Sequence, residues 1–439
     1  MIALILASCG DDPPLPGERF DVRTPLAASA GGETTAAAVE PLPEGSVVQN
    51  DVAFSASAQT NPSEWTHRGG SATHRIQHPA LSSNLTRIWT ASIGTGNSRK
   101  ARITADPIVA GGRIFTLDSR SQLSAFSTGG AAQWSKDLTP GSERKKDGSG
   151  GGLAYGGGRL YVTSGFGELH ALDPATGNTI WVQAFEAPVA GAPTVRDGMI
   201  YVSSRDNRAF AVRADTGRLA WQLQASPSAS ATVNGSGPAV DGRIAIFPFG
   251  SAELLGAQTG DGTRTWGTTL AGRRRGRAYS LITDISSDPV IVGGTVYVGT
   301  PSGRIAALDA SSGSRIWTAN EGALSPVWVD GGSVFAVSDL LQLVRLDASN
   351  GELLWAVDLP GFKKKKPRKY RDVYASFGPV LAGGRLLVAS DDGYLRSFDP
   401  RNGNLLSSVE IPGGAATNPV VVNQTLYLVN TKGQLLAYR

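Results

Sequence analysis

The amino-acid sequence predicts an all-β fold, an eight-bladed β-propeller of four-stranded antiparallel blades that is closed by an N-terminal strand completing the last blade. Three observations predict it. A phrase ending in tryptophan recurs along the chain, a phrase with the pattern of two short strands recurs between its copies, and each chain end carries part of one incomplete unit. The 55 Gly and 25 Pro among 439 residues, with only 18% charged residues, indicate many short turns and few long helices.

The tryptophan phrase is clearest as "ALDPATGNTIW", which ends at Trp181, and as "ALDASSGSRIW", which ends at Trp317. Seven copies align, and each has a glycine four residues before the aromatic position, which Ser407 occupies in the last copy. Because glycine adopts positive φ freely, we expect a tight hairpin turn at each of these glycines. We expect the tryptophans to lie as apolar spacers between neighbouring blades. The structural blade tryptophans are Trp89, Trp134, Trp181, Trp221, Trp266, Trp317 and Trp355.

The second phrase has eight copies, among them "SDPVIVGGTVYVGT" and "TNPVVVNQTLYLVN". Each copy is typical of two short strands around a turn, and a third strand follows before the tryptophan strand. One unit therefore contains four antiparallel strands in roughly 38 to 52 residues, which is the period of a propeller blade and not of a helical solenoid.

The two chain ends predict how the ring closes. The eighth copy of the second phrase ends at Arg439 before any tryptophan strand, while an unpaired tryptophan strand around Trp89 precedes the first unit. Together they make one complete blade. This closure leaves no unpaired sheet edge, which removes a site of aggregation.

The N-terminal residues have a different composition. Leu6-Ala7-Ser8-Cys9 is typical of a bacterial lipobox, so we expect residues 1–9 to be a lipoprotein signal segment, truncated because it lacks a basic start, with Cys9 lipidated. An apolar segment with a buried thiol is the alternative. Residues 10–62 are rich in Pro, Ala and Gly and are expected to form a disordered tether, and residues 63–439 form the propeller. No other stretch approaches ~18 consecutive apolar residues, so we expect membrane attachment through lipid only.

The phrase LD-x-x-[S/T/N]-G-x-x-x-W is similar to the tryptophan-docking repeat of pyrroloquinoline-quinone-type propellers, and the Gly-His and Trp-Asp pairs of WD repeats are absent. With the lipobox, the eight blades and the swapped closing strand, residues 60–439 resemble the BamB family of outer-membrane protein assembly lipoproteins. The resemblance implies a non-catalytic scaffold without a cofactor, held at the outer membrane and facing the periplasm, that assists delivery of nascent outer-membrane proteins.

The alternative to the scaffold is an enzyme, because quinone-dependent dehydrogenases share this fold. A periplasmic quinone-dependent oxidoreductase would need a vicinal cysteine pair and calcium ligands, whereas Cys9 is the one cysteine. His67, His74 and His78 lack a common helical face and an acidic companion at ligand spacing, so we expect them to cap the base of the ring and to bind no metal. A polysaccharide-binding propeller would need exposed aromatic platforms, for which Trp328 is the one non-repeat tryptophan inside the ring.

Four basic runs hold seventeen of the 41 basic residues, and each follows a tryptophan strand. In antiparallel blades these connections emerge on one face, so we expect a basic rim that binds an acidic protein surface or anionic lipid headgroups; ordinary solvated loops are the alternative. Nucleic acid is not expected for an exported protein. The runs are Arg99, Lys100 and Arg102; Arg144, Lys145 and Lys146; Arg273, Arg274, Arg275 and Arg277; and Lys363, Lys364, Lys365, Lys366, Arg368, Lys369 and Arg371.

The resemblance also implies a partner, the BamA-like barrel-inserting protein, whose periplasmic POTRA domains meet the connections after Trp221 and Trp266. Asp284 matches one acidic position of the second connection, and Ser286 stands where another acid is expected. Val233 and Asn234 replace a Leu-Arg pair in the first. The expected partner-binding residues are Val233, Asn234, Arg273, Arg274, Arg275, Arg277, Asp284 and Ser286.

Overall fold

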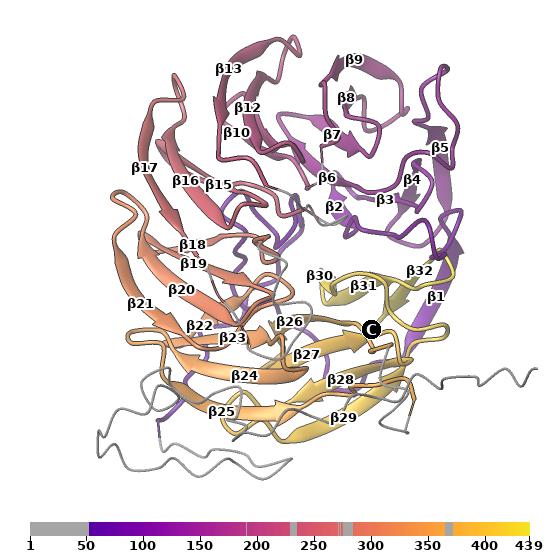
Figure 1. Cartoon of the computed structure of the whole chain (residues 1–439). Coiled ribbons are helices and arrows are strands. Elements are labelled where there is room, and N and C mark those ends of the chain that lie inside the picture. Colours follow the sequence, from indigo (N-terminus) through magenta and orange to yellow (C-terminus); the bar gives the residue numbers. More distant parts are fainter. Residues whose placement is uncertain are drawn as a thin grey trace, which may run out of the picture. The chain divides into compact units, whose positions relative to one another are not determined.

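The chain forms a ring of eight β-sheets (Figure 1). The computed structural model describes residues 52–189, 191–228, 235–270, 272, 274, 284–364 and 372–439, and these residues belong to one compact unit. These described residues contain 32 strands and no helix. Every sheet has four antiparallel strands, so the predicted eight-bladed propeller is confirmed.

The first four blades follow one another along the chain. Blade 1 contains β2 (Ile108–Ala110), β3 (Arg113–Leu117), β4 (Gln122–Ser127) and β5 (Ala132–Asp137). Blade 2 contains β6 (Gly151–Gly156), β7 (Arg159–Ser164), β8 (Glu168–Leu172) and β9 (Thr179–Ala184). Blade 3 contains β10 (Thr194–Arg196), β11 (Met199–Ser203), β12 (Arg208–Arg213) and β13 (Leu219–Gln224). Blade 4 contains β14 (Ala239–Asp241), β15 (Ile244–Pro248), β16 (Glu253–Gln258) and β17 (Arg264–Thr269).

The next three blades repeat this order, and the last combines both chain ends. Blade 5 contains β18 (Val290–Val292), β19 (Thr295–Thr300), β20 (Arg304–Asp309) and β21 (Arg315–Ala319). Blade 6 contains β22 (Trp328–Asp330), β23 (Ser333–Val337), β24 (Gln342–Asp347) and β25 (Leu353–Asp358). Blade 7 contains β26 (Ser376–Ala382), β27 (Arg385–Ser390), β28 (Tyr394–Phe398) and β29 (Leu405–Glu410). Blade 8 contains β30 (Val420–Val422), β31 (Thr425–Val429), β32 (Gln434–Tyr438) and β1 (Arg87–Ser92).

The first strand of each blade lies nearest the centre of the ring and the fourth lies at the rim (Figure 1). Inner and middle strands are buried almost throughout, whereas the rim strands alternate between exposed and half-buried positions, as in β9. The two middle strands are apolar at nearly every position because neighbouring blades pack on both of their faces. The hydrophobic core is therefore divided among the interfaces between blades.

The closing strand lies where the sequence predicted it. β1 pairs antiparallel with β32, with Trp89 opposite Ala437 and Ser92 opposite Gln434. Beyond the strands, the backbone amides of Thr86 and Arg439 donate to each other's carbonyl oxygens over 2.8 and 3.0 Å. The N-terminal strand and the C-terminal blade thus close the ring by backbone hydrogen bonds.

Each turn glycine of the tryptophan phrase has a second role beyond the turn. Gly177 has φ +74°, and a Cβ atom there would lie 2.6 Å from the indole of Trp134 in the preceding blade. The Trp134 Nε1 then donates to the Pro174 carbonyl of the same turn over 3.1 Å. Five more tryptophans make the equivalent hydrogen bond to the following blade: Trp181, Trp221, Trp266, Trp317 and Trp355. The predicted wedges between blades are confirmed.

The junction between blades 7 and 8 explains Ser407. In every other blade the third and fourth strands are joined by a turn whose glycine receives the tryptophan of the preceding blade. In blade 8 these two strands are β32 and β1, which come from opposite ends of the chain and share no turn. No turn glycine exists for a tryptophan of blade 7 to cover, so serine occupies the aromatic position.

The segment before β1 closes one end of the central channel. It makes a hydrogen bond with the first strand of every blade or with the turn after it, and it holds the ring from inside. In blade order the bonds are Trp65 N to Val109 O (2.7 Å), Tyr155 N to Thr66 O (2.8 Å), Val195 N to His67 Nε2 (3.1 Å), Val240 N to Ala72 O (2.8 Å), Ile291 N to Thr73 O (3.0 Å), Ser57 N to Asp330 Oδ1 (2.7 Å), Gly383 N to Pro79 O (2.8 Å) and Asn423 N to Pro62 O (2.9 Å).

The three histidines of this segment cap the ring, as predicted. His67, His74 and His78 are buried, and each bonds a backbone group of a blade, such as the Gly384 amide that donates to His78 Nε2 over 2.8 Å. Burial lowers the pKa of His67 to about 3, and burial also lowers the pKa of His74. Both rings are therefore neutral at pH 7.

Residues 52–62, which the sequence assigns to the tether, lie against the blades. Arg345 is completely buried, and its guanidinium donates to the carbonyl oxygens of Val52 and Ala53 over 3.0 and 3.2 Å. The Phe54 ring packs edge-on against Phe335, with centroids 5.4 Å apart. The folded unit thus extends to residues before 63, while residues 1–51, including Cys9, lie outside the described residues.

Candidate partner-docking face

The connections between blades share one face of the ring. Because the four strands of a blade alternate in direction, the connection to the next blade and the turn between the second and third strands emerge on the same side. We call this side the connection face, and the opposite side the hairpin face. The N-terminal segment closes the channel at the hairpin face, because it bonds the ends of the first strands and the turns that follow them.

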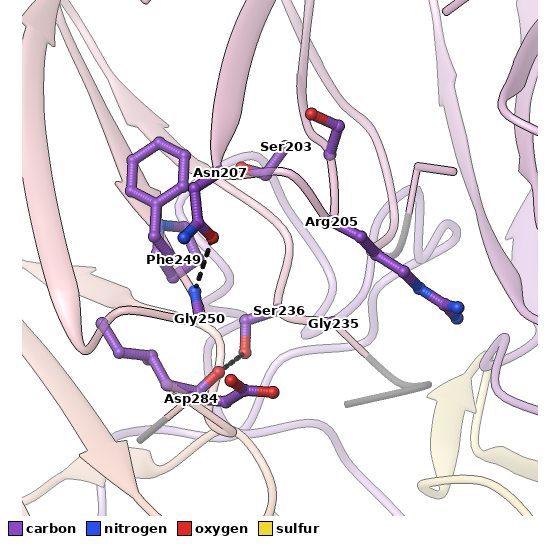
Figure 2. A pocket seen from close by; sticks show the side chains of 11 residues that line it. Ser203, Arg205, Asn207, Gly235, Ser236, Phe249, Gly250 and Asp284 are labelled. Atoms are coloured by element: carbon purple, nitrogen blue, oxygen red, sulfur yellow. Dashed lines mark hydrogen bonds between the residues drawn. The ribbon is translucent and has the colours of Figure 1, made fainter. Parts of the chain in front are cut away.

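A pocket lies on the connection face between blades 3 and 4 (Figure 2). It encloses about 360 Å³, part of which is open to solvent. Two second-to-third-strand turns and two connections supply its walls, so residues as far apart in the sequence as Ser203 and Ile285 meet there. The lining residues are Ser203, Ser204, Arg205, Asn207, Gly235, Ser236, Pro248, Phe249, Gly250, Asp284 and Ile285.

The two connections that the resemblance singles out touch each other in this pocket. Ser236, in the β13–β14 connection, donates from Oγ to the carbonyl of Ile285, in the β17–β18 connection, over 2.7 Å (Figure 2). Ser236 is 6% exposed. The hydrogen bond is therefore shielded from water and fixes one connection against the other.

Asn207 forms the hydrogen bonds that hold the opposite wall of the pocket together. It has φ +61°, a conformation that asparagine tolerates better than most residues. Its Oδ1 accepts from the Gly250 amide of blade 4 over 3.1 Å (Figure 2). Its Nδ2 donates to the Ser226 carbonyl over 2.7 Å. One buried side chain thus links two blades and the start of the β13–β14 connection.

The expected partner-binding residues differ in where they lie and in whether the structure describes them. Asp284 lies in the pocket wall and is 4% exposed, and Ser286 donates from Oγ to the Ala323 carbonyl over 2.6 Å. The structure thus brings these two residues to the connection face beside the pocket. The others except Arg274 lie outside the described residues: Val233, Asn234, Arg273, Arg275 and Arg277.

Arg274 is placed differently from the sequence expectation of an exposed rim residue. Its side chain is 3% exposed and forms an ion pair with Asp339 of blade 6, with Nε 2.5 Å from Oδ2. The basic run "RRRGR" gave no sign of this, because the carboxylate that receives Arg274 lies 65 positions away in the sequence. Arg274 therefore adds no exposed charge to the rim.

The other described rim residues are exposed, and several bind nearby acids. Lys145 lies 2.6 Å from Asp137, and Lys363 lies 2.7 Å from Asp391. These pairs reduce the charge that the rim presents to a partner. The side chains of Arg99, Lys100, Arg102, Arg144, Lys146 and Lys364 are exposed, while Lys365, Lys366, Arg368, Lys369 and Arg371 lie outside the described residues.

A buried charge cluster at the centre of the ring was missed by the sequence analysis. Arg68 Nε lies 2.9 Å from Asp288 and 3.4 Å from Asp106. Burial would lower the pKa of Arg68, but the two carboxylates hold this pKa above its usual value. The one available signal was an aspartate before a proline at the start of two first strands, in "ADPIV" and "SDPVI", because Asp106 and Asp288 hold these two positions.

Within the described ranges, no three His, Cys, Asp or Glu side chains come close enough together to hold a metal ion. The described residues likewise include no helix of the length and apolarity needed to span a membrane.

Comparison with known proteins identifies relatives. A family profile described as outer membrane protein assembly factor BamB matches residues 119–357 and 341–439. The BamB of Yersinia pestis is 23% identical over 360 residues, covering 80% of this chain and 88% of that protein. The BamB of Bordetella pertussis is 26% identical over 357 residues, covering 80% and 86%.

Two solved structures share the fold. BamB from Moraxella catarrhalis superposes with a TM-score of 0.67 at 18% identity, covering 81% of this chain and all of that one. Quinohemoprotein alcohol dehydrogenase from Comamonas testosteroni superposes with a TM-score of 0.66 at 15% identity, covering 86% and 80%. The residues of this chain do not fit a quinone held by a vicinal disulfide, because the one cysteine, Cys9, precedes the propeller.

Proposed function

The chain belongs to the family of outer membrane protein assembly factor BamB, and on that basis we propose that it is a non-catalytic scaffold of the machinery that assembles outer-membrane β-barrels. A scaffold needs a rigid body and an accessible docking face. The closed ring supplies the body, because every blade is held to its neighbours and to the N-terminal segment. The connection face supplies the docking surface.

The hydrogen bond between Ser236 and Ile285 is the observation that carries this proposal. It joins the β13–β14 and β17–β18 connections into one surface, with the pocket between them. A partner that docks there contacts blades 3, 4 and 5 together. The POTRA domains of a BamA-like barrel-inserting protein are the proposed partner.

Within this surface, Asp284 and Ser286 are the described residues proposed to belong to the docking site: buried Asp284 forms part of the pocket wall, and half-buried Ser286 lies beside it. Val233, Asn234, Arg273, Arg275 and Arg277 are proposed to contribute from the same two connections. Arg274 acts on the partner through the position of the connection, because its side chain is buried. Exposed lysines and arginines of the rim are proposed to add attraction to acidic protein surfaces or anionic lipid headgroups that weakens as salt is added.

The remaining proposals concern the location of the protein. Lipidated Cys9 would attach the scaffold to the outer membrane on the periplasmic side, and residues 10–51 would serve as its tether. Nascent outer-membrane proteins are the proposed clients, which the scaffold would help to present to the barrel-inserting partner. No nucleic acid is involved.

Binding to the soluble POTRA segment of the partner from the same organism tests the proposal. The full chain should bind this segment in a titration, and Ser236→Asp should weaken the binding at least ~10-fold because it inserts a charge between the two connections. Asp197→Ala, on the hairpin face, is the matched control and should bind as the parent does. Absence of binding by the unmodified chain at micromolar concentration would refute the docking proposal.

A further inference from the structure

We propose that Arg274 is a positioning residue that fixes the β17–β18 connection against blade 6 and thereby orients the wall of the pocket formed by Asp284 and Ile285. This inference rests on the proposed docking function, since it assigns a role to that surface. It concerns a residue that touches no partner itself.

The contacts of Arg274 span two blades. Its Nη2 lies 2.9 Å from Asp339 Oδ1 and its Nε lies 2.5 Å from Oδ2, so the guanidinium binds the carboxylate through two parallel hydrogen bonds. The same Nη2 donates to the Asn320 carbonyl over 2.7 Å and lies 3.6 Å from Glu321. Arginine is the residue whose planar fork fits such an arrangement.

Between the β17–β18 connection and Asp339, the Arg274 side chain lies against blade 5. A Cβ atom on Gly303, in the turn between β19 and β20, would lie 2.7 Å from Arg274 Nε. The arginine therefore lies directly on this turn, and glycine leaves the space that it needs. The side chains of Arg274, Asp339 and Glu321 are 3%, 1% and 4% exposed, so the pair is shielded from salt.

The other end of the same connection reaches the same place. Ser286 Oγ donates to the Ala323 carbonyl, while Asp339 Oδ1 accepts from the Gly322 amide over 2.8 Å. Arg274 and Ser286 thus hold two points of the β17–β18 connection to residues 320–323. Asp284 and Ile285 lie next to the second point, and the Ile285 carbonyl receives Ser236.

Arg274→Lys is the variant that tests the positioning of the β17–β18 connection without preventing folding of the ring. Lysine keeps a positive charge beside Asp339, so the ring folds, but its single ammonium group cannot reproduce the paired bonds to Asp339 and the bond to Asn320. Arg396→Lys is the matched control, because Arg396 makes a similar paired contact with Asp392 inside blade 7, at 3.1 and 2.6 Å.

Two measurements are made on the full chain and both variants. Hydrogen exchange is followed at the amides of Ile285 and Ser287, which donate to Phe249 and Gly299 across the base of the connection. The affinity for the POTRA segment is measured by titration. For Arg274→Lys we expect exchange at these amides to be about 10-fold faster and affinity about 10-fold weaker, with the melting temperature nearly unchanged. Arg396→Lys should change neither.

The outcomes separate this inference from the docking proposal. Parental exchange rates in Arg274→Lys would overturn the positioning role, even if affinity fell, because the arginine would then act by direct contact. Parental exchange and parental affinity together would overturn it as well. If the unmodified chain does not bind the POTRA segment, the docking proposal fails, and the exchange rates alone decide whether Arg274 positions the connection.

Discussion

The Nε atom of Arg68 lies 2.9 Å from Oδ2 of Asp288, and this ion pair joins the N-terminal segment to blade 5 at the centre of the ring. The same guanidinium lies 3.4 Å from Asp106 of blade 1. Blades 1 and 5 are four positions apart in a ring of eight, so they lie opposite each other. One buried cation therefore connects the two halves of the propeller.

Replacement of Arg68 by glutamine should destabilise the ring strongly. The change leaves Asp106 and Asp288 buried without their cation, which costs about 3–5 kcal/mol when one partner of a buried pair is removed. Urea unfolding followed by tryptophan fluorescence measures the loss. Arg401→Gln breaks an ion pair on an exposed side chain and should leave the midpoint unchanged; equal midpoints for both variants would contradict the central role of Arg68.

Substitution of the turn glycines by alanine should lower stability in two separable ways, through backbone strain and through a clash with a tryptophan. Gly158→Ala introduces a Cβ at φ +76° where nothing lies within 4 Å, so it measures backbone strain alone, about 1 kcal/mol. Gly177→Ala adds the same strain and also a clash with Trp134, which costs ~1–3 kcal/mol more. Thermal unfolding of both variants gives the difference. Equal losses would show that the tryptophan does not need the space.

Acid should weaken the fold through its buried histidines. Burial lowers the pKa of His67 to about 3 and that of His170 to about 4, whereas the unfolded chain binds the proton near pH 6.5. The unfolded state therefore gains protons first as pH falls. Stability is full above pH 6.5 and decreases by roughly 1.4 kcal/mol per pH unit and per histidine between pH 6.5 and the folded pKa.

His67→Gln tests this dependence. The variant should show a smaller slope of unfolding free energy against pH between pH 6.5 and 4.5, because one of the proton-linked groups is gone. Denaturant titrations at several pH values measure it. A slope identical to that of the parent chain would mean that His67 is protonated in the folded state.

Phe54 should anchor the start of the folded unit. Its ring packs on Phe335 and lies 5.3 Å from the Arg345 guanidinium, so Phe54→Ala removes apolar contact and a cation–π interaction, with an expected loss of about 1–3 kcal/mol. Val52→Ala changes a side chain that is 42% exposed and serves as the control. Limited proteolysis should cut the Phe54 variant faster near residue 57; equal cleavage rates would contradict the anchor.

Much of the fold could be predicted from the sequence because each blade repeats one local rule. Alternating strands, a glycine at positive φ and a tryptophan four residues later recur, and the incomplete units at the two ends could only join each other. Ser407 departs from the rule, but the missing turn in blade 8 explains it.

The site was harder to predict because burial depends on partners far away in the sequence. Arg274 belongs to a basic run whose composition predicts exposure. Its side chain is instead buried in an ion pair with Asp339 of blade 6. Residues 52–57 have the composition of a tether, yet Arg345 binds the carbonyl groups of Val52 and Ala53. The arginine itself, in "LVRLD", gives no local sign that it is buried.

A footprint of the partner on the chain tests the docking account most directly. Hydrogen exchange of the full chain is compared with and without the POTRA segment. The account predicts protection at residues 203–207, 235–236, 248–250 and 284–287, which surround the pocket on the connection face, and none at the turns 196–199 and 241–244 on the hairpin face. Protection confined to the hairpin face, or to the rim strands, would contradict it.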